Sequence, residues 1–191
     1  MDDGRIRCWP VRDEIARAYH DEEWGRPVRD EVRLFEKICL EAFQSGLSWD
    51  TILRKRPAFR AAFAAFDPEA VAAFGEVDVA RLLADPGIVR NRRKIEATTA
   101  NARAVVAMHA AGETLAELIW AHAPRRHRVP RTLADMPPST PESTALAREL
   151  KGRGLRFVGP TTVYAMMQAV GVVNDHVERC WVRDEVEALR A

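Results

Sequence analysis

Hydrophobic residues recur at three- and four-residue intervals along most of the chain, and this helical spacing limits the possible folds more than any other feature. Val32, Phe35 and Cys39 repeat in this way, as does Leu34 with Ile38. Similar patterns predict helices over residues 68–74, 91–111, 113–121, 141–151, 160–170 and 175–189. Alternating strand patterns are absent, and the proline- and arginine-rich residues 124–141 indicate a long loop. We therefore expect an all-α fold.

The length of the chain fits a single domain in a reducing compartment. Its 191 residues can bury a core, and no change of composition divides them. No apolar stretch reaches membrane-spanning length, and residues 1–5 do not resemble a signal peptide. Three cysteines cannot all pair with one another, so we expect a cytoplasmic protein whose thiols serve as metal ligands rather than in disulfides.

The distribution of charge is more informative than its sum. The formal net charge of +1 argues against a strongly basic nucleic-acid binder. Basic residues nevertheless gather in four short runs, at residues 54–56, 90–94, 125–128 and 151–153. Each run alone is typical of a solvated helix face, although together they would be compatible with a basic surface.

Two thiols and two imidazoles lie near the two ends of the chain: Cys8, His20, His176 and Cys180. This set would fill a tetrahedral zinc site, which would then be structural and would join the two ends. The spacing of His176 and Cys180 would place both on one face of a helix. The alternative is that these residues are unrelated, because their spacing is not that of a common zinc finger. Asp21 and Asp175 adjoin the histidines and could orient their rings, or could be solvated surface groups.

Residues 150–161 have the pattern of two helices joined by a tight turn. A helix ends among the glycines, and a second begins with Pro160 at its first position. Gly159 allows close approach of the backbone, and the N–H groups at the new helix start suit a phosphate. This indicates a helix-hairpin-helix that holds DNA by its backbone, or else an ordinary helical hairpin.

Glu41 is in phase with Leu34 and Ile38, so it extends an apolar stripe. A carboxylate in that position needs a partner or a ligand. The alternative is an exposed ion pair with Lys37, one helical turn earlier, in the weaker order of charges.

Residues 46–49 predict a tight corner between two helices. Gly46 can end one helix and Ser48 can cap the next. Leu47 could then pack on the following helix as a hydrophobic staple. It could equally be an apolar wedge that fills the gap left in a duplex by an extruded base.

Three tryptophans and a tyrosine lie within the first 49 residues: Trp9, Tyr19, Trp24 and Trp49. Such density usually reflects core packing. It would equally suit a cage that stacks on a flat, positively charged ring.

Short motifs follow one another from about Cys8 to Cys180, at residues 19–21, 23–25, 34–35, 38–41, 46–49, 85–90, 94–95, 101–104, 157–159 and 173–177. In content and order they resemble the 3-methyladenine DNA glycosylase I family of the helix-hairpin-helix superfamily. The resemblance implies a bilobal all-α glycosylase fold over residues 1–191, with the hairpin at about 143–170. It also implies one structural Zn²⁺ per chain, joining the terminal segments through Cys8, His20, His176 and Cys180.

The resemblance also implies the activity and the residues that serve it. The expected enzyme is a monomeric, monofunctional glycosylase that flips 3-methyladenine out of alkylated duplex DNA and removes it by hydrolysis, leaving an abasic site for base excision repair. No lysine stands out as a Schiff-base nucleophile. The implied site comprises a catalytic Glu41, a base pocket of Tyr19, Trp49, Trp24 and Trp9, and DNA contacts by Gly46, Leu47, Gly159 and Thr161. Family members lack the aspartate that most of the superfamily uses at the sugar, so Asp175 is not given that role.

Two positions depart from the family pattern. Trp9 follows Cys8 directly, where a glycine often intervenes in family members, and the second departure affects the pocket. Family members commonly have a second pocket tyrosine three residues before Tyr19, where this chain has Ala16. A roomier pocket would alter the range of lesions, and a non-enzymatic binder of damaged DNA is a further alternative. An unrelated zinc-stapled interaction module would have no need for Glu41 on an apolar stripe.

Overall fold

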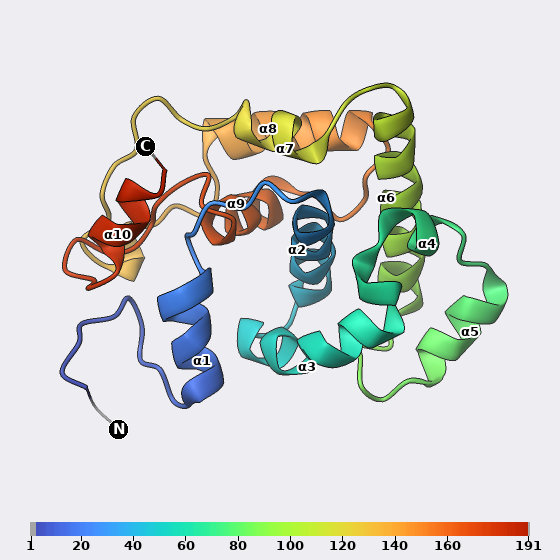
Figure 1. Ribbon diagram of the computed structural model, residues 1–191, viewed down its shortest axis with the longest axis horizontal. Helices are drawn as coiled ribbons and strands as arrows, with labels where there is room; N and C mark the ends of the chain where they lie inside the picture. Colours follow the sequence, from blue (N-terminus) through green and yellow to red (C-terminus); the bar gives the residue numbers. More distant parts are fainter. Residues whose placement is uncertain (1–2, 191) are drawn as a thin grey trace.

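The computed structural model describes residues 3–190, which form helices and turns without any strand (Figure 1). The all-α prediction is confirmed. In chain order the elements are α1 (Glu14–Ala18), η1 (Tyr19–Glu23), α2 (Glu31–Gln44), α3 (Trp49–Ala62), η2 (Ala64–Phe66), α4 (Pro68–Ala72), α5 (Glu76–Ala84), α6 (Arg92–Ala110), α7 (Leu115–Trp120), η3 (Leu133–Asp135), α8 (Pro141–Gly152), α9 (Pro160–Ala169) and α10 (Arg183–Ala188). Within residues 3–190, no helix combines the length and the apolar character needed to cross a membrane.

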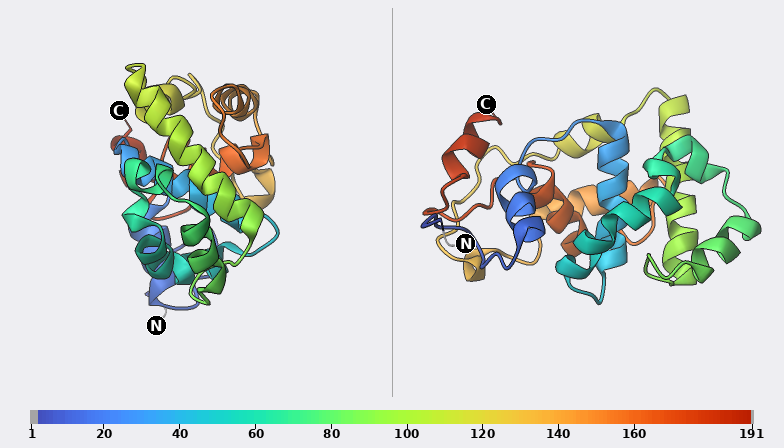
Figure 2. Two further views of the ribbon diagram at one scale, coloured as in Figure 1. Left: turned by 90° about the vertical axis from the view of Figure 1, so that its right-hand side faces the viewer. Right: turned by 60° about the horizontal axis from the view of Figure 1, so that its bottom comes forward.

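The helices are arranged around α2, which is buried along most of its length. α1 and α10 lie at one end of the molecule, whereas α4, α5 and α6 lie at the other, and the right-hand view of Figure 2 shows the same order. The larger hydrophobic core gathers buried residues of α2, α3, α6, α8 and α9. A smaller core contains Cys8, Tyr19, Trp24 and Cys180. Trp49 packs against both cores, so it lies at their boundary.

Helix starts follow the capping residues that the sequence offers. The side chain of Ser48 accepts a hydrogen bond from the amide of Thr51 at 3.2 Å, and Asp67 caps α4 with Pro68 at its first position. Asn91 caps α6 in the same way. The predicted corner at residues 46–49 and the predicted starts of these two helices are therefore confirmed.

The predicted helix over residues 175–189 is wrong for its first half, because only α10 is helical and residues 171–182 form turns, bends and irregular backbone. Tertiary hydrogen bonds hold this segment instead. The carboxylate of Asp175 accepts from the Tyr164 hydroxyl at 2.7 Å and from the Gln168 amide at 2.6 Å. His176 and Cys180 thus lie on a turn rather than on one face of a helix.

A close approach of two glycine-containing turns brings the C-terminal third of the chain against the N-terminal segment. Gly171 follows α9 with φ +77°, and a Cβ atom there would lie 2.6 Å from the carbonyl oxygen of Gly25. Gly25 has φ +83°, and a Cβ on it would lie 3.0 Å from Nε2 of His176. Only glycine fits either position without displacing the neighbouring backbone or ring.

Candidate functional site

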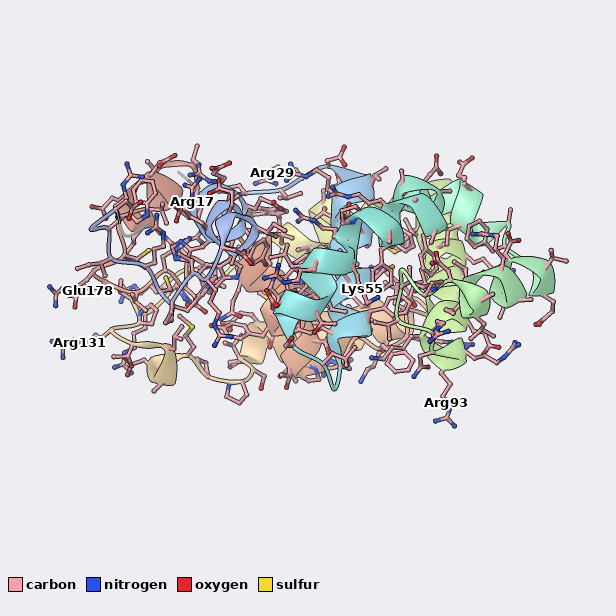
Figure 3. All side chains as sticks on the ribbon, turned by 90° about the horizontal axis from the view of Figure 1, so that it is seen from below. Arg17, Arg29, Lys55, Arg93, Arg131 and Glu178 are labelled. Carbon is pink, nitrogen blue, oxygen red and sulfur yellow. The ribbon has the colours of Figure 1, made fainter. Side chains whose placement is uncertain are left out.

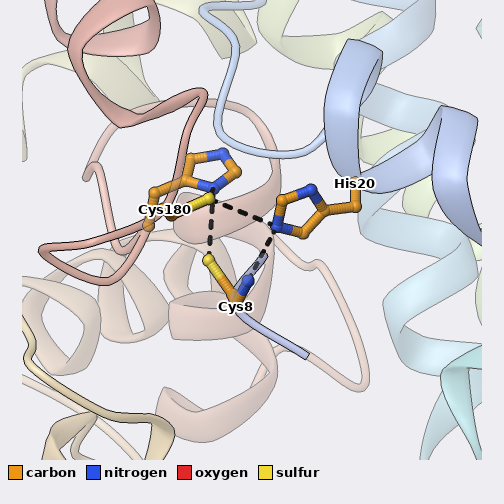
Figure 4. Close-up of side chains that lie close together, drawn as sticks. Cys8, His20 and Cys180 are labelled. Atoms are coloured by element: carbon orange, nitrogen blue, oxygen red, sulfur yellow. Dashed lines mark hydrogen bonds between the residues drawn. The ribbon is translucent and has the colours of Figure 1, made fainter. Parts of the chain in front are cut away.

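The four residues near the chain ends meet in a buried cluster of thiols and imidazoles (Figure 4). Sγ of Cys8 lies 3.3 Å from Nδ1 of His176. Sγ of Cys180 lies 3.4 Å from the same nitrogen and 3.6 Å from Nε2 of His20. All four ligand atoms are within 4.8 Å of one another, so the cluster could hold a metal ion.

Hydrogen bonds on the far side of each ring orient the two histidines. Nδ1 of His20 lies 2.8 Å from the carboxylate of Asp21, and Nε2 of His176 lies 2.9 Å from the carbonyl oxygen of Trp24. Because both oxygens accept, these nitrogens carry the protons and leave the lone pairs of the other two facing the sulfurs. The tautomer that results is the one a metal ligand requires.

Asp21 is itself held in place, whereas Asp175 does not touch the cluster rings. Burial alone would raise the pKa of Asp21, but hydrogen bonds, foremost those from Arg7, lower it to about 2. Asp175 pairs instead with the ring of His127 at 2.5 Å. The prediction that an aspartate orients a cluster histidine is therefore confirmed for Asp21 and wrong for Asp175.

The thiols differ in acidity within the cluster. A hydrogen bond from Cys8 lowers the pKa of the Cys180 thiol despite its burial. The amide of Val177 also donates to Sγ of Cys8 at 3.4 Å. The hydrogen bond between the two thiols, together with burial, raises the pKa of Cys8, so this contact favours the thiolate, which is the form that binds metals, at Cys180 only.

A cavity of about 570 Å³, here called the aromatic cavity, lies where the two hydrophobic cores meet. Its lining includes the five residues predicted for the base site: Trp9, Tyr19, Trp24, Glu41 and Trp49. Ala16 lies on the lining as well, so the position that departs from the family pattern faces this space. The sequence prediction of a shared pocket agrees with this geometry.

The aromatic rings form two pairs within the cavity wall. The rings of Tyr19 and Trp49 are 5.2 Å apart and inclined at 39°, and those of Trp9 and Trp24 are 4.9 Å apart and nearly perpendicular. Tyr19 is placed by η1, a π-helical turn in which the amide of Trp24 donates to the carbonyl of Tyr19 at 2.8 Å. This turn directs Tyr19 to the cavity and His20, its neighbour, to the cluster.

Glu41 is buried, as predicted, and its partner is Lys37, so the two residues form a buried ion pair rather than an exposed one. Nζ of Lys37 lies 3.0 Å from Oε1 of Glu41, 3.0 Å from the Tyr19 hydroxyl and 3.5 Å from the centre of the Trp49 ring. Burial and the charge of Glu41 raise the pKa of Tyr19, so the phenol stays protonated. The helical phase that identified Glu41 also places Lys37 on the same side of α2, although it does not indicate the contacts with Tyr19 and Trp49.

The cavity and the cluster share one wall. The ring of Trp9 packs edge-on against His20 at 4.7 Å, and that of Trp24 packs edge-on against His176 at 4.6 Å. Each histidine of the cluster therefore supports one tryptophan of the cavity.

The loop between α2 and α3 projects beside the cavity. Leu47 is 42% exposed at its tip, next to Gly46. The ammonium of Lys94 fixes the base of this loop by donating to the carbonyls of Phe43 at 2.8 Å and Ser45 at 2.6 Å. An exposed leucine on a fixed loop fits the predicted wedge better than the predicted staple.

The predicted hairpin is formed by α8 and α9. The side chain of Asn101 pins its turn, because it donates to the carbonyl of Arg156 at 3.1 Å and accepts from the Arg156 amide at 2.6 Å. Gly159 precedes α9, no side chain caps that helix, and Thr161 in its first turn is exposed. The N–H groups at this helix start are thus presented at the surface.

The basic runs are engaged by the protein itself only in part. In the first run, Arg54 pairs with Asp50, Lys55 donates to two backbone carbonyls, and Arg56 pairs with Glu23. Exposed arginines remain at Arg90, Arg93, Arg125, Arg126 and Arg128. Figure 3 shows Arg93 and Arg131 projecting from different ends of the molecule.

Comparisons with known proteins agree with this geometry. A family model described as methyladenine glycosylase matches residues 9–184. DNA-3-methyladenine glycosylase 1 of Escherichia coli (strain K12) is 49% identical over 177 residues, which cover 91% of this chain and 95% of that protein. A crystal structure of 3-methyladenine DNA glycosylase I has a TM-score of 0.89 at 49% identity, covering 92% of this chain and 98% of that one.

A more distant structure has the same fold. It describes 3-methyladenine recognition by 3-methyladenine DNA glycosylase I from Staphylococcus aureus, with a TM-score of 0.86 at 32% identity, and covers 91% of this chain and 93% of that one. The resemblance inferred from the motifs is confirmed, and this chain belongs to the methyladenine glycosylase family.

Proposed function

We propose that this protein is a monofunctional DNA glycosylase that flips and excises 3-methyladenine from alkylated duplex DNA, leaving an abasic site for base excision repair. The carrying observation is the aromatic cavity, where a buried carboxylate shares one space with four aromatic side chains. We expect one bilobal helix-hairpin-helix domain over residues 1–191, acting as a monomer in the cytoplasm.

Excision of 3-methyladenine requires little acid catalysis from the protein. Methylation at N3 gives the adenine a positive charge and weakens its bond to the sugar, so the base leaves readily once it is flipped. Tyr19 and Trp49 stack on the flipped base, with Trp9 and Trp24 closing the wall. Glu41 accepts a hydrogen bond from the exocyclic amine and stabilises the base in place.

The reaction involves no covalent intermediate between a lysine and the sugar, because the lysine amine beside the cavity is held in an ion pair. Lys37 is paired with Glu41 and does not line the aromatic cavity. Water therefore attacks the sugar, and the strand is left uncut. A borohydride-trapped adduct between protein and DNA would contradict this.

The DNA contacts come from the two exposed loops. Leu47, with Gly46, enters the duplex and fills the gap left by the flipped nucleotide. Gly159 and Thr161 bind phosphates through the uncapped N-terminus of α9. These contacts carry no sequence information, as befits an enzyme that must act wherever the lesion occurs.

We assign the metal of the cluster as one structural Zn²⁺ held by Cys8, His20, His176 and Cys180. Ordinary zinc–sulfur and zinc–nitrogen bonds at a tetrahedral angle would separate a sulfur from a nitrogen by about 3.6 Å, close to the 3.3–3.6 Å between these atoms. With four protein ligands, the ion would have no open position and would join the chain ends rather than take part in hydrolysis.

The direct test is chromatography of the free bases released from methylated duplex DNA by the purified protein. We expect release of 3-methyladenine, with a loss of about tenfold or more in the Glu41→Gln variant, which keeps an acceptor but lacks the charge. Glu36→Gln is the matched control, because Glu36 is buried on the same helix but pairs with Arg60 outside the aromatic cavity. Full activity of Glu41→Gln would contradict the proposed role of Glu41.

A second candidate rests on Ala16, which lies on the cavity lining and leaves room for a larger or different base. Release of another methylated base in the same experiment would favour it. Tight binding of damaged duplex without release of any base would favour a non-enzymatic binder.

A further inference from the structure

The side chain of Lys37 does not line the aromatic cavity, but its charge lies against residues that do. Its side chain is only 12% exposed, and its ammonium contacts Glu41, the Tyr19 hydroxyl and the face of Trp49. These are the three residues to which the proposed function assigns the closest contacts with the base. A buried cation beside all three changes the electrostatics of the whole site.

The placement of Lys37 follows from two cavities that share one wall. Tyr19 and Trp49 line both the aromatic cavity and a smaller space of about 50 Å³, here called the rear cavity. Lys37 lines only the rear cavity, whereas Glu41 lines only the aromatic one. The ammonium therefore lies behind the wall on which a base would stack.

Two consequences oppose the selection of a positively charged base. The ammonium compensates the charge of Glu41, which would otherwise attract a cation. It also lies over the Trp49 ring, so the attraction of that ring for a second cation is weakened by repulsion between the two. Burial lowers the pKa of Lys37, and the charge of Glu41 opposes this effect, as expected for an ion pair held inside the protein.

We propose that Lys37 sets the charge selectivity of the aromatic cavity, reducing its preference for a cationic purine over a neutral purine of the same shape. This inference rests on the proposed function and deepens it. It extends the substrate class of the site toward neutral alkylated or modified purines, and it makes Lys37 a specificity-determining residue that acts through Glu41 and Trp49.

The size of the effect follows from the distances. A base stacked on Trp49 would place its charge about 7 Å from the Lys37 ammonium, given stacking at van der Waals distance on the opposite side of the ring. Two like charges at that separation in a partly buried site repel enough to change a binding ratio by about tenfold, equivalent to about 1.4 kcal/mol.

The experiment combines two kinetic constants, one for a cationic base and one for a neutral base. Excision of 3-methyladenine gives kcat/KM for the cationic base. A duplex that carries 3-deaza-3-methyladenine, a neutral isostere with a stable bond to the sugar, gives Ki as a competitor. The product of kcat/KM and Ki compares the cationic base with the neutral one, so it reports the preference for charge. A displacement of Glu41 alone would weaken the contact with the amine of both bases equally and would leave this product unchanged.

Two neutral variants and two controls sharpen the test. Lys37→Met removes the charge, and Lys37→Gln removes it while keeping a donor for Glu41, so one of them remains informative if the other unfolds. Lys37→Arg keeps the charge, and the rear cavity beside it offers room for the larger head group. Arg33→Met removes a charge one turn earlier on α2, where Arg33 is exposed, borders the rear cavity and does not contact Glu41.

We expect the product to rise about tenfold in Lys37→Met and Lys37→Gln, and to stay within twofold of the wild type in Lys37→Arg and Arg33→Met. If the wild type excises 3-methyladenine but the neutral variants leave the product unchanged, this inference is wrong and the proposed function stands. If the wild type excises no base, the proposed function is wrong and the inference falls with it.

Discussion

Replacing Cys180 with alanine tests whether a metal ion joins the two ends of the chain. Cys180 and His176 lie close to Cys8, from which His176 is separated by 168 positions. A cross-link that closes a loop of this length reduces the entropy of the unfolded chain by an amount equivalent to about 5 kcal/mol. We therefore expect the variant to lose up to about 5 kcal/mol of the free energy of unfolding.

The assay combines metal analysis with thermal unfolding. For a chain of this size, about 5 kcal/mol corresponds to a decrease in Tm of roughly 10–20 °C. Cys39→Ala is the matched control, because Cys39 is the remaining cysteine and is buried on α2 away from the cluster. It should cost only about 1 kcal/mol and retain one metal ion per chain after dialysis.

Chelation provides an independent comparison. A strong chelator should lower the Tm of the wild type to that of Cys180→Ala and leave the variant itself unaffected. The reasoning would be refuted by a wild type that holds no metal, or by a Cys180→Ala variant that melts within about 3 °C of Cys39→Ala.

Three further predictions concern the hairpin, the N-terminal segment and the wedge. Asn101→Ala removes both hydrogen bonds to the backbone of Arg156, so titration of undamaged duplex should show weaker binding, and unfolding should show a loss of about 1–3 kcal/mol. Burial raises the pKa of Asp21, but hydrogen bonds, chiefly from Arg7, lower it to about 2 in the folded protein. In chelator-treated protein, the free energy of unfolding lost in Asp21→Asn should therefore be constant above about pH 4 and disappear as the pH falls through 2. Denaturant titration at each pH measures this loss. Leu47→Ala should change stability by less than about 0.5 kcal/mol, because the side chain is exposed, yet slow excision from duplex DNA more than from single strands, in a paired assay of the two substrates.

Local chemistry made much of the fold predictable. Ser48, Asp67 and Asn91 cap the helices that their sequence positions indicate, because a cap acts within three residues of itself. The segment before α10 was not predictable in this way. Its hydrogen bonds run from Asp175 to Tyr164 and other distant residues, and such tertiary contacts override local helical preference.

In the candidate site, too, features set within one helix were predictable, and contacts between separate elements were not. The buried position of Glu41 follows from the periodicity of one helix, and the structure agrees. The contact of Lys37 with Trp49 and Tyr19 joins three separate elements, so no pattern within α2 could specify it. The resemblance to a known family named the pocket residues, but it could not indicate a cation of the protein's own beside them.

The wall shared by the cavity and the cluster has a consequence for biosynthesis. Trp24 rests on His176, and its carbonyl accepts a hydrogen bond from the ring of that histidine, so one side of the cavity is completed by a residue that is translated about 150 positions later. A nascent chain that has not yet released residues 176–180 from the ribosome contains Glu41 and all four cavity aromatics, but lacks the support that sets their geometry. Activity should therefore appear only after residues 176–180 have left the ribosome, and chains terminated before residue 176 should be inert rather than partly active on the genome.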